Sequence, residues 1–388
     1  MKKEEKLNIL FDKLANELSI TNTMLDRAET AYNSLGNYIK NYNDNWDVII
    51  YPQGSFELGT VIRPLNSEEQ YDVDLVVLMK SPTFDAHSLR AEILELLKKH
   101  GRYEGDIENK KPCIRIQYSD SSQFHMDIAC AKKINSNNPT IDIARFDGIS
   151  NYYYEQSNPK GYINWFKQVM KFEKIQKERK ALFEKASTEV EDLRLSRMRT
   201  PLQKAIQILK RHRDIYFSQK YNSDDRPSSI IITTLCAKAY ENTYGTFDNS
   251  NIYLTIVNML NTFPQYLQLK NGEYYLENPS NPQENFLNKW NSNHNLITAF
   301  NSWILQARED IINNPEQFIE SDPNKLQNVL LESFGEVEVR KALDEYGKTF
   351  GELASNGDFK YDAKTANIIL GGSLGTAYNA HTYFGGDE

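Results

Sequence analysis

The stretch that decides the fold is YPQGSFELGTVIRPLNSEEQYDVDLVV, residues 51–77. It places a short turn, Gly54 and Ser55, ahead of an apolar run that carries two aspartates, Asp72 and Asp74. The run YDVDLVVLM alternates as a β-strand does, and residues two apart in a strand project from the same face of a sheet. Asp72 and Asp74 therefore lie side by side, where like charges repel each other and the loss of water is costly. The pattern requires a partner of opposite charge.

A divalent cation is the partner that these carboxylates favour. Mg²⁺ prefers hard oxygen ligands and also binds substrate phosphates, and Mn²⁺ is the alternative ion. Two such ions about 3.5–4 Å apart activate an attacking hydroxyl group and stabilise the leaving oxygen of an in-line displacement. Asp72 and Asp74 are thus predicted metal ligands. The alternative, that they are surface acids on an edge strand, fits poorly with the apolar residues LVVLM that follow.

The Gly-Ser turn supplies the other half of the predicted site. Gly54 lets the backbone approach a phosphate closely, because it has no side chain. The Ser55 hydroxyl and the neighbouring backbone N–H groups can donate hydrogen bonds to a triphosphate, and the following FELGT can add a helix N-terminus. We therefore expect a metal-bound triphosphate opposite the two aspartates.

Two-metal chemistry generally uses a further carboxylate, and Asp127 is the candidate. It is the lone acid in FHMDIACA, a predicted strand where an unpaired charge would be costly. We expect Asp127 to bind metal and to accept the proton of the attacking hydroxyl; the alternative is a buried salt bridge. His125 shares the face of Asp127, and we expect it to support the site rather than to bind metal.

Composition limits the class of protein. The chain has 388 residues and a formal net charge of −8, and this acidic balance argues against a protein that coats long nucleic acid. Its three cysteines (Cys113, Cys130 and Cys236) form no zinc or disulfide pattern. No apolar run reaches transmembrane length, and the first residues, MKKEEKLNIL, are too charged for a signal peptide. We expect a soluble, cytoplasmic protein that binds no membrane.

The pattern of predicted elements divides the chain near residue 160. Residues 1–160 begin with helical periodicity, in which a second helix or a bend starts at Thr21 or Asn22. The predicted strands DVIIY, YDVDLVVLM, CIRIQYS and FHMDIACA follow, with one capped helix among them. This order is typical of an α/β (α+β) lobe on a mixed central sheet.

The second half reads as helical. The segment TPLQKAIQILKRHRDIYFSQK opens with Thr200 as its cap and Pro201 at the first helical position, which is a strong start signal. We expect a bilobal molecule: residues 1–160 form a catalytic lobe that includes the N-terminal long helix, and residues 161–370 form an all-helical lobe. The site lies in the cleft between them, and the Gly-rich residues 371–388 form a flexible tail.

These motifs resemble those of a known family. QGSFELGT, DVD and the later lone aspartate are similar to the signature of polymerase-β-type nucleotidyltransferases. The longer match, which adds NPKGYINWFK, PLQKAIQILKRHRD and RPSSIIITTL, resembles the bacterial cGAS/DncV-like nucleotidyltransferases (CD-NTases) and covers nearly all of the chain. The Gly-Ser and Asp-x-Asp elements belong to the whole superfamily, so the helical half carries the narrower resemblance.

The resemblance implies roles for further residues. Gln53 and the Gly-Ser turn would hold the donor triphosphate beside the three metal-binding aspartates. Lys210 would reach the β- and γ-phosphates from the long helix, and Ser228, or equally Ser229, would contact the triphosphate from the start of the next helix. From the residues alone, Lys210 lies in the basic run KRHRD, which fits a solvated helix face as well as a phosphate site.

The resemblance also implies an activity. The family makes cyclic di- or trinucleotide second messengers from nucleoside triphosphates, in anti-phage defence (CBASS), and we expect two Mg²⁺ ions and ATP among the substrates. A 3′ or 2′ hydroxyl would attack the α-phosphate of a bound triphosphate, and the linear product would then close into a ring. We expect a monomer; control by a regulatory protein encoded nearby is one implication of the resemblance.

Other functions stay open at this level. A nucleotidyltransferase that modifies an RNA end, a protein or a small molecule would use the same catalytic residues. A catalytically inactive nucleotide-binding sensor would keep the fold without the reaction, although the intact set of acids argues against it.

Overall fold

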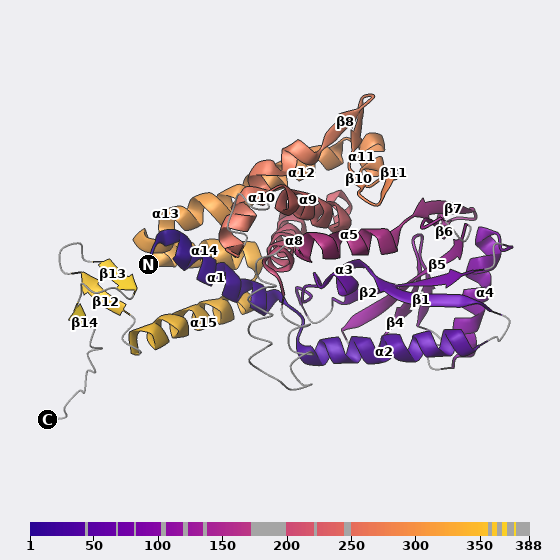
Figure 1. The fold of residues 1–388 in the computed structure, drawn as a ribbon, viewed down its shortest axis with the longest axis horizontal. Coiled ribbons are helices and arrows are strands. Elements are labelled where there is room, and N and C mark those ends of the chain that lie inside the picture. Colours follow the sequence, from indigo (N-terminus) through magenta and orange to yellow (C-terminus); the bar gives the residue numbers. More distant parts are fainter. Residues whose placement is uncertain are drawn as a thin grey trace.

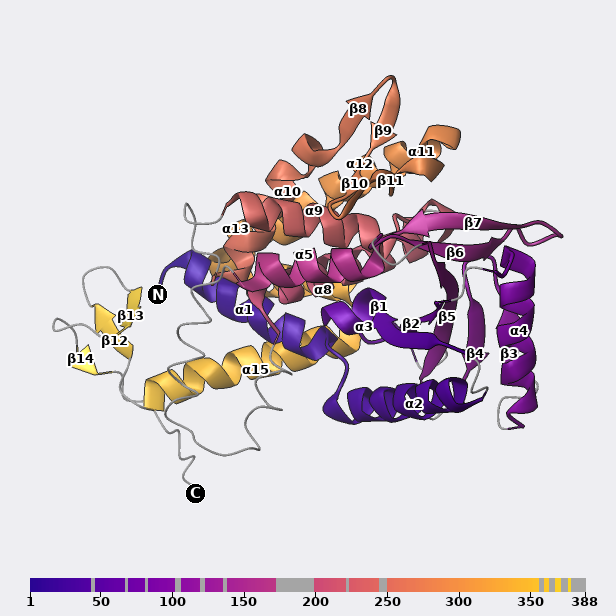
Figure 2. The same ribbon diagram turned by 45° about the vertical axis from the view of Figure 1, so that its right-hand side comes forward.

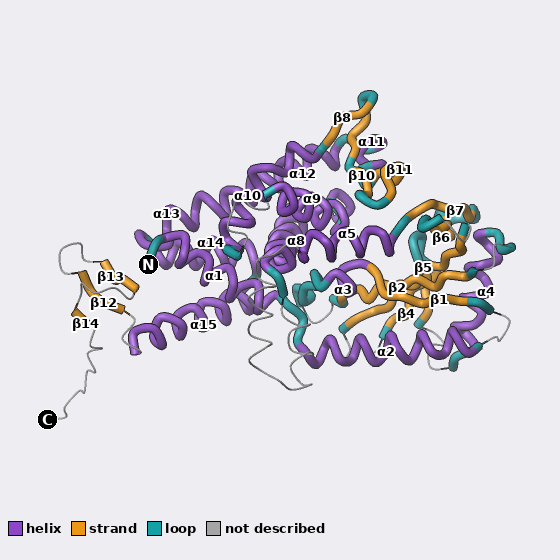
Figure 3. The backbone as a smooth tube through the Cα atoms, in the orientation of Figure 1, coloured by secondary structure: helices purple, strands orange, loops and turns teal. Residues whose placement is uncertain are grey.

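The computed structural model describes residues 1–42, 46–66, 69–80, 83–101, 106–118, 123–134, 138–171, 199–220, 223–243, 250–355, 359–362, 367–370 and 376–377. A sheet-based lobe and a mainly helical lobe lie side by side along the long axis of the molecule (Figures 1 and 2). Figure 3 shows the main sheet gathered at one end and most helices at the other. The predicted bilobal fold class is confirmed.

One mixed sheet of seven strands forms the centre of the catalytic lobe. Its order is β1-β2-β5-β4-β3, with β6 paired to β5 and β7 paired to β6. Strands β2 and β5 run parallel, and the chain crosses between them through α4, β3 and β4, as a parallel pair requires. The strands are β1 (Val48–Gln53), β2 (Tyr71–Met79), β3 (Ile107–Asn109), β4 (Ile114–Gln117), β5 (Phe124–Lys133), β6 (Ile141–Phe146) and β7 (Tyr152–Ser157).

Alternation along the strands gives the sheet two different faces. One face carries apolar residues such as Val73 and Met126, which pack in a core with helices α2 (Asn22–Asn41) and α4 (Ala86–Lys99). Of the alternatives left open for this segment, the structure shows a helix capped by Thr21, whose hydroxyl accepts a hydrogen bond from the Met24 N–H at 3.1 Å. With α2 and α4 on the apolar face, the polar residues of the same strands are left on the other face.

The helical lobe is built around α8, which is buried along most of its length. Pro201 opens this helix and the Thr200 hydroxyl accepts from the Gln203 N–H at 3.2 Å, as the start signal predicted. Two short hairpins, β8–β9 and β10–β11, interrupt the helices, so the lobe is not wholly helical. Besides α1, which is described below, the helices of eight or more residues within the described part of this lobe are α5 (Pro159–Lys171), α8 (Pro201–Lys220), α9 (Ser229–Asn242), α10 (Ile252–Tyr266), α12 (Asn295–Arg308), α13 (Asn314–Ser321), α14 (Pro323–Phe334) and α15 (Glu336–Ser355). The shorter elements are η1 (Ser223–Asp225), α11 (Asn288–Ser292), η2 (Glu309–Asn313), β8 (Gln268–Lys270), β9 (Glu273–Tyr275), β10 (Glu277–Asn278) and β11 (Asn281–Asn285).

Helix α1 (Lys3–Leu18) corrects one part of the predicted division. We expected it in the catalytic lobe, but its apolar stripe, which includes Leu7, Phe11 and Leu14, lies in the core of the helical lobe. Phe11 stacks on Tyr253 of α10 with ring centroids 5.6 Å apart. The physical reason is that α2 and α4 already cover the apolar face of the sheet, so the stripe of α1 packs against helices instead.

The C-terminal part is described only in pieces. Strand β12 (Phe359–Asp362) pairs with β13 (Asn367–Leu370) and β14 (Thr376–Ala377). Of the predicted flexible tail, 371–388, only the two residues of β14 lie within the described part of the chain, and there they form a strand. In the described ranges, no helix has the length and apolar character needed to cross a bilayer.

Candidate active site

Strand register sets two rows of polar side chains on the face of the sheet away from α2 and α4. Each row consists of residues directly opposite one another on neighbouring strands, and such residues share a face. The first row runs across β1, β2, β5, β4 and β3 and contains Gln53, Asp74, Asp127, Arg115 and Glu108. The second row runs across β2, β5 and β4 and contains Asp72, His125 and Gln117. The aspartates predicted to converge therefore do so on two adjacent parallel strands.

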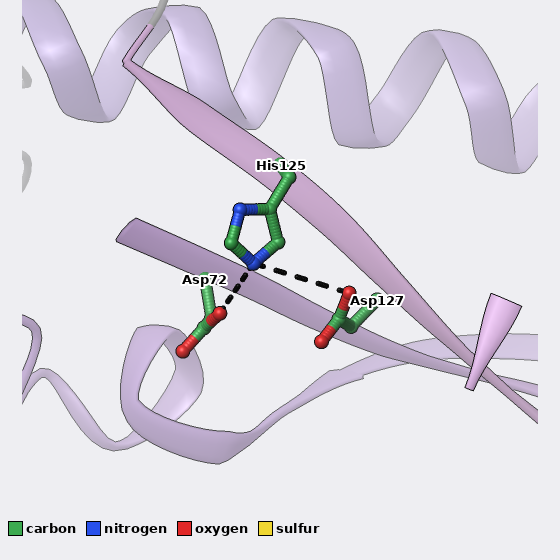
Figure 4. A group of neighbouring side chains, drawn as sticks. All are labelled: Asp72, His125 and Asp127. Atoms are coloured by element: carbon green, nitrogen blue, oxygen red, sulfur yellow. Dashed lines mark hydrogen bonds and ion pairs between the residues drawn. The ribbon is translucent and has the colours of Figure 1, made fainter. Parts of the chain in front are cut away.

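Asp72, His125 and Asp127 can hold a metal ion together. One ligand atom from each lies within 4.8 Å of the others (Figure 4). The His125 Nε2 is 2.5 Å from Asp72 Oδ1 and 4.0 Å from Asp127 Oδ1, and its Nδ1 is 3.2 Å from Gln70 Oε1. We expected His125 to support the site only, and its contact with Asp72 fits that role, but its ring also belongs to the group of candidate ligands.

Asp74 is half-buried and is packed against the Gly-Ser turn. Gly54 has φ of +63°, and a Cβ at this position would overlap the Asp74 carboxylate, so only glycine fits. Burial raises the pKa of Asp74 well above its ordinary value, and the charges of Asp72 and Asp127 raise it further. A bound cation would stabilise the ionised form of Asp74 beside the other two acids, so the donor set fits a divalent ion.

Asp72 behaves differently from Asp74. Burial would raise its pKa, but the hydrogen bond with His125 and the positive charges of His125, Arg115 and Lys210 outweigh burial and lower the pKa. Asp72 is thus held ionised at the mouth of the site, whereas Asp74 is held in the interior.

Two cavities of similar size meet at the acids. The first, of about 620 Å³, is lined by Ser55, Asp72 and a set of cations, and we call it the basic cavity; the cations are Arg63, Arg115, Lys210, Arg213 and Arg226. The second, of about 640 Å³, is lined by Asp74, Asp127 and many amide side chains, and we call it the polar cavity; the amides are Gln53, Gln156, Asn278, Asn281, Gln283, Asn285 and Asn288. Both volumes lie in the range of small-molecule sites. The acids therefore form the boundary between a cavity suited to phosphates and one suited to hydrogen-bonding bases.

Lys210 lies inside the basic cavity rather than on a solvated helix face, so that alternative is wrong. Its side chain is only 3% exposed, and its Nζ donates to the Thr60 carbonyl and hydroxyl oxygens, each at 3.2 Å. Burial, together with the neighbouring Arg213, lowers the pKa of Lys210 to about 7. A phosphate in this cavity would restore the charge of the amine.

The other predicted phosphate contacts divide between the cavities. Ser55 lines the basic cavity, whereas Gln53 and Gly54 line the polar one. Of the two candidates at the start of α9, Ser229 lines the basic cavity, and its hydroxyl accepts a hydrogen bond from Arg213 at 3.1 Å. Ser228 is the N-cap residue of α9 and is not among the lining residues. The geometry thus favours Ser229 over Ser228.

Arg115 is a residue of the site that the sequence analysis did not identify. Its Nε and Nη2 donate to the two carboxylate oxygens of Asp127 at 2.7 Å and 2.8 Å, and its Nη2 is 3.6 Å from Asp72 Oδ1. Asp127 thus forms a salt bridge, which the sequence analysis considered as the alternative to metal binding. The two roles are compatible, because a carboxylate that accepts from one arginine keeps lone pairs for another partner. The alternation in CIRIQYS placed Arg115 on a polar face, but only the register shows which acid it meets.

Helix α8 also fixes the segment that follows the Gly-Ser turn. Along its buried side, Gln203, Gln207 and Arg211 donate to the backbone carbonyls of Leu58, Val61 and Arg63 at 2.8, 2.6 and 2.8 Å. These side chains are four residues apart, so they lie on one face of α8 and together hydrogen-bond to one backbone segment, residues 58–63. The helical lobe thereby holds the turn that faces the acids.

Comparisons with known proteins agree with this geometry. Residues 49–131 match the family model described as cyclic GMP-AMP synthase DncV-like, nucleotidyltransferase domain. A curated relative, the c-di-GMP synthase of Roseivirga ehrenbergii, is 28% identical over 352 residues, which cover 89% of this chain and 88% of the relative.

Solved structures share the fold over most of the chain. The Bradyrhizobium diazoefficiens CD-NTase CdnG, solved with GTP, has a TM-score of 0.67 at 17% identity and covers 88% of this chain and 99% of its own. The E. coli MS115-1 CdnC:HORMA-deltaN complex has a TM-score of 0.62 at 13% identity and covers 84% of this chain and 96% of its own. Vibrio cholerae DncV, solved with the linear intermediate 5′ pppA(3′,5′)pG, has a TM-score of 0.55 at 14% identity and covers 86% of this chain and 87% of its own. The chain thus resembles CD-NTases in fold over most of its length, it contains a match to a DncV-like nucleotidyltransferase domain at residues 49–131, and it is similar along most of its length to a c-di-GMP synthase.

Proposed function

We propose that this protein joins two nucleoside triphosphates, in a Mg²⁺-dependent reaction, and closes the product into a cyclic dinucleotide. The observation that carries the proposal is the position of the acids between the basic and polar cavities. This arrangement suits nucleotidyl transfer, because the triphosphate and the two bases differ in chemistry while the α-phosphate must lie beside the catalytic carboxylates.

The residues of the chain divide the work in a simple way. Ser55, Lys210 and Ser229 bind the triphosphate of the donor in the basic cavity. Asp127 orients the attacking hydroxyl and takes its proton. The amides of the polar cavity hold the bases, which fixes the hydroxyl in line with the α-phosphate. Held by Asp72, Asp74 and Asp127, Mg²⁺ would supply charge neutralisation for the transferred phosphoryl group and activation of the hydroxyl.

Guanosine triphosphate is the substrate that we propose first. The curated relative is named a c-di-GMP synthase, and one structural neighbour was solved with GTP. ATP remains the other expected substrate, since a second neighbour was solved with ATP. We also propose a role in anti-phage signalling and control by a protein partner; the complex of CdnC with a HORMA protein supports the latter.

Incubation with each triphosphate alone and with all four together tests the activity, with the product identified by mass spectrometry. We expect pyrophosphate release and a cyclic dinucleotide that contains guanosine, with no added acceptor. Transfer that occurs only when RNA, protein or a small molecule is supplied would favour the alternative nucleotidyltransferase. Absence of pyrophosphate release under every condition, including addition of the partner protein encoded nearby, would favour a nucleotide sensor.

A further inference from the structure

Arg115 flanks the acid cluster, on a strand that the catalytic motifs do not include. In the first polar row it lies between Asp127 on β5 and Glu108 on β3. Its side chain is 24% exposed, and Asp127 is 12% exposed, so the pair is largely shielded from water. An ion pair of this kind is weakly screened, and removal of one partner leaves the other charge uncompensated.

The contacts of Arg115 differ from those of an arginine that only maintains the fold. Buried Arg90 of α4 donates to the backbone carbonyls of Ala144, Lys110 and Cys113, and so ties several segments together. Within the described part of the chain, the hydrogen bonds recorded for Arg115 go to Asp127 alone, and its other close charge is Asp72. Arg115 therefore acts on the acids and not on the backbone.

The geometry of the pair fixes Asp127 in two respects. Donation from Nε to Oδ1 and from Nη2 to Oδ2 sets the plane of the carboxylate as well as its position, which a single donor cannot do. Asp74 lies directly opposite Asp127 in the register, and repulsion between them would otherwise turn the two carboxylates apart. The positive charge of Arg115 offsets part of this repulsion.

We propose that Arg115 is a positioning residue and the internal counter-ion of the acid cluster. It orients Asp127 toward the attacking hydroxyl, and it reduces the net negative charge of the cluster while no metal is bound. The inference rests on the proposed nucleotidyl transfer at this site. It predicts two effects of opposite sign: loss of the charge strengthens metal binding, because a cation no longer competes with the metal, and loss of the forked geometry slows turnover.

Two variants separate charge from geometry. Arg115→Lys keeps the charge and loses the fork, and Arg115→Gln loses both. The matched control is Lys110→Gln, which removes an exposed cation that follows β3 and is paired with Glu108; no ion pair joins it to Asp72, Asp74 or Asp127 in the described part of the chain. Binding of Mn²⁺ to the nucleotide-free protein is measured by titration, and steady-state turnover is followed by pyrophosphate release.

We expect Arg115→Gln to bind Mn²⁺ about tenfold more tightly, the order expected when a unit charge is removed a few ångströms from a divalent ion. Its kcat falls about 10–100-fold with a small change in KM, as for other residues that orient metal ligands. Arg115→Lys binds Mn²⁺ like the wild type but shows a similar loss of kcat. The Lys110→Gln control matches the wild type in both measurements.

Three results would overturn the inference. Metal affinity and turnover of Arg115→Gln that fall together would indicate a structural role. A raised KM with unchanged kcat in Arg115→Gln would indicate that Arg115 binds phosphate in the basic cavity. Full activity of Arg115→Lys would show that the charge of Arg115 matters and that its forked geometry does not. Mn²⁺ titration needs no substrate, and pyrophosphate release accompanies any nucleotidyl transfer. Both measurements therefore test the role of Arg115 even if the product is not a cyclic dinucleotide.

Discussion

At the scale of single residues, the site is a balance of buried charges. Asp74 is raised in pKa by burial and by its neighbours, Asp72 is lowered, and Lys210 is lowered to about 7. The charged forms of Asp74 and Lys210 are therefore disfavoured in the protein without metal or substrate. The charged form of Asp72 is favoured, but it depends on the neighbouring His125 and cations. Perturbed pKa values of this kind cluster at functional sites, which supports the proposed roles of these residues.

Asp74→Asn is expected to stabilise the metal-free protein and to abolish activity. Asparagine removes the repulsion with Asp72 and Asp127, so the free energy of unfolding in EDTA should rise by about 1 kcal/mol or more. Turnover should fall by more than about 100-fold, beyond the loss that is usual for a residue supporting a metal ligand.

The pH dependence of this effect has a definite sign. The folded pKa of Asp74 is raised, so its favourable contribution is complete below the unfolded pKa of about 3.9 and is lost as pH rises through the folded pKa. The gap in melting temperature between Asp74→Asn and the wild type should therefore widen as pH rises from about 4. A wild type that is the more stable protein in EDTA at pH 8 would contradict the charge assignment.

Lys210→Met is expected to stabilise the ligand-free protein and to weaken triphosphate binding. Between about pH 7 and the ordinary lysine pKa near 10, the unfolded chain holds a proton that the folded chain does not. Wild-type stability should thus rise with pH over this window, and Lys210→Met should lack the rise. Near pH 7 the variant should be more stable by about 1–3 kcal/mol after loss of the hydrogen bonds to Thr60.

Denaturation with and without GTP separates these effects. The triphosphate should stabilise the wild type more than Lys210→Met, and its binding near pH 8 should take up a proton only in the wild type. Equal stabilisation by GTP in both proteins would remove Lys210 from the phosphate site.

At the scale of elements, the arrangement of the site depends on strand pairings that cannot be read from the sequence of a single strand. The alternation in YDVDLVVLM and FHMDIACA predicted the strands and the shared face of Asp72 and Asp74. The register that puts Arg115 opposite Asp127 is set by strand pairing over a distance in sequence, so Arg115 could not be assigned.

Helix α1 shows the same limit. Its apolar stripe, which includes Leu7 and Phe11, predicted a buried face but not the lobe against which that face packs. The choice between Ser228 and Ser229 depended on one residue at a helix start, where sequence patterns fix boundaries least well.

Gln207→Leu tests whether α8 positions the segment that follows the Gly-Ser turn. Gln207 is fully buried, donates to the Val61 carbonyl at 2.6 Å and accepts from the Ser19 hydroxyl at 3.1 Å. Leucine has a similar volume but leaves those groups unpaired, so the free energy of unfolding should fall by about 1–3 kcal/mol. KM for the triphosphate should rise more than kcat falls. The exposed Gln168→Leu on α5 is the control, and equal behaviour of the two variants would show that α8 does not position the turn.

At the scale of the whole molecule, neither lobe forms the site alone. The basic cavity takes Ser55 and Asp72 from the catalytic lobe and Lys210 and Ser229 from the helical lobe. Hairpin β10–β11 closes the polar cavity and meets the end of β7, where the Ser157 hydroxyl donates to Glu284 at 2.9 Å. The sequence predicted a cleft between two lobes, but the division into two cavities arises from packing of distant segments and was not predictable from local patterns.

A crystal structure with Mg²⁺ and a non-hydrolysable GTP analogue tests the central claim most directly. We predict the triphosphate in the basic cavity against Ser55, Lys210 and Ser229, the metal between Asp72, Asp74 and Asp127, and a guanine base in the polar cavity. A nucleotide bound elsewhere, or metal found away from the three aspartates, would contradict the assignment of this site to nucleotidyl transfer.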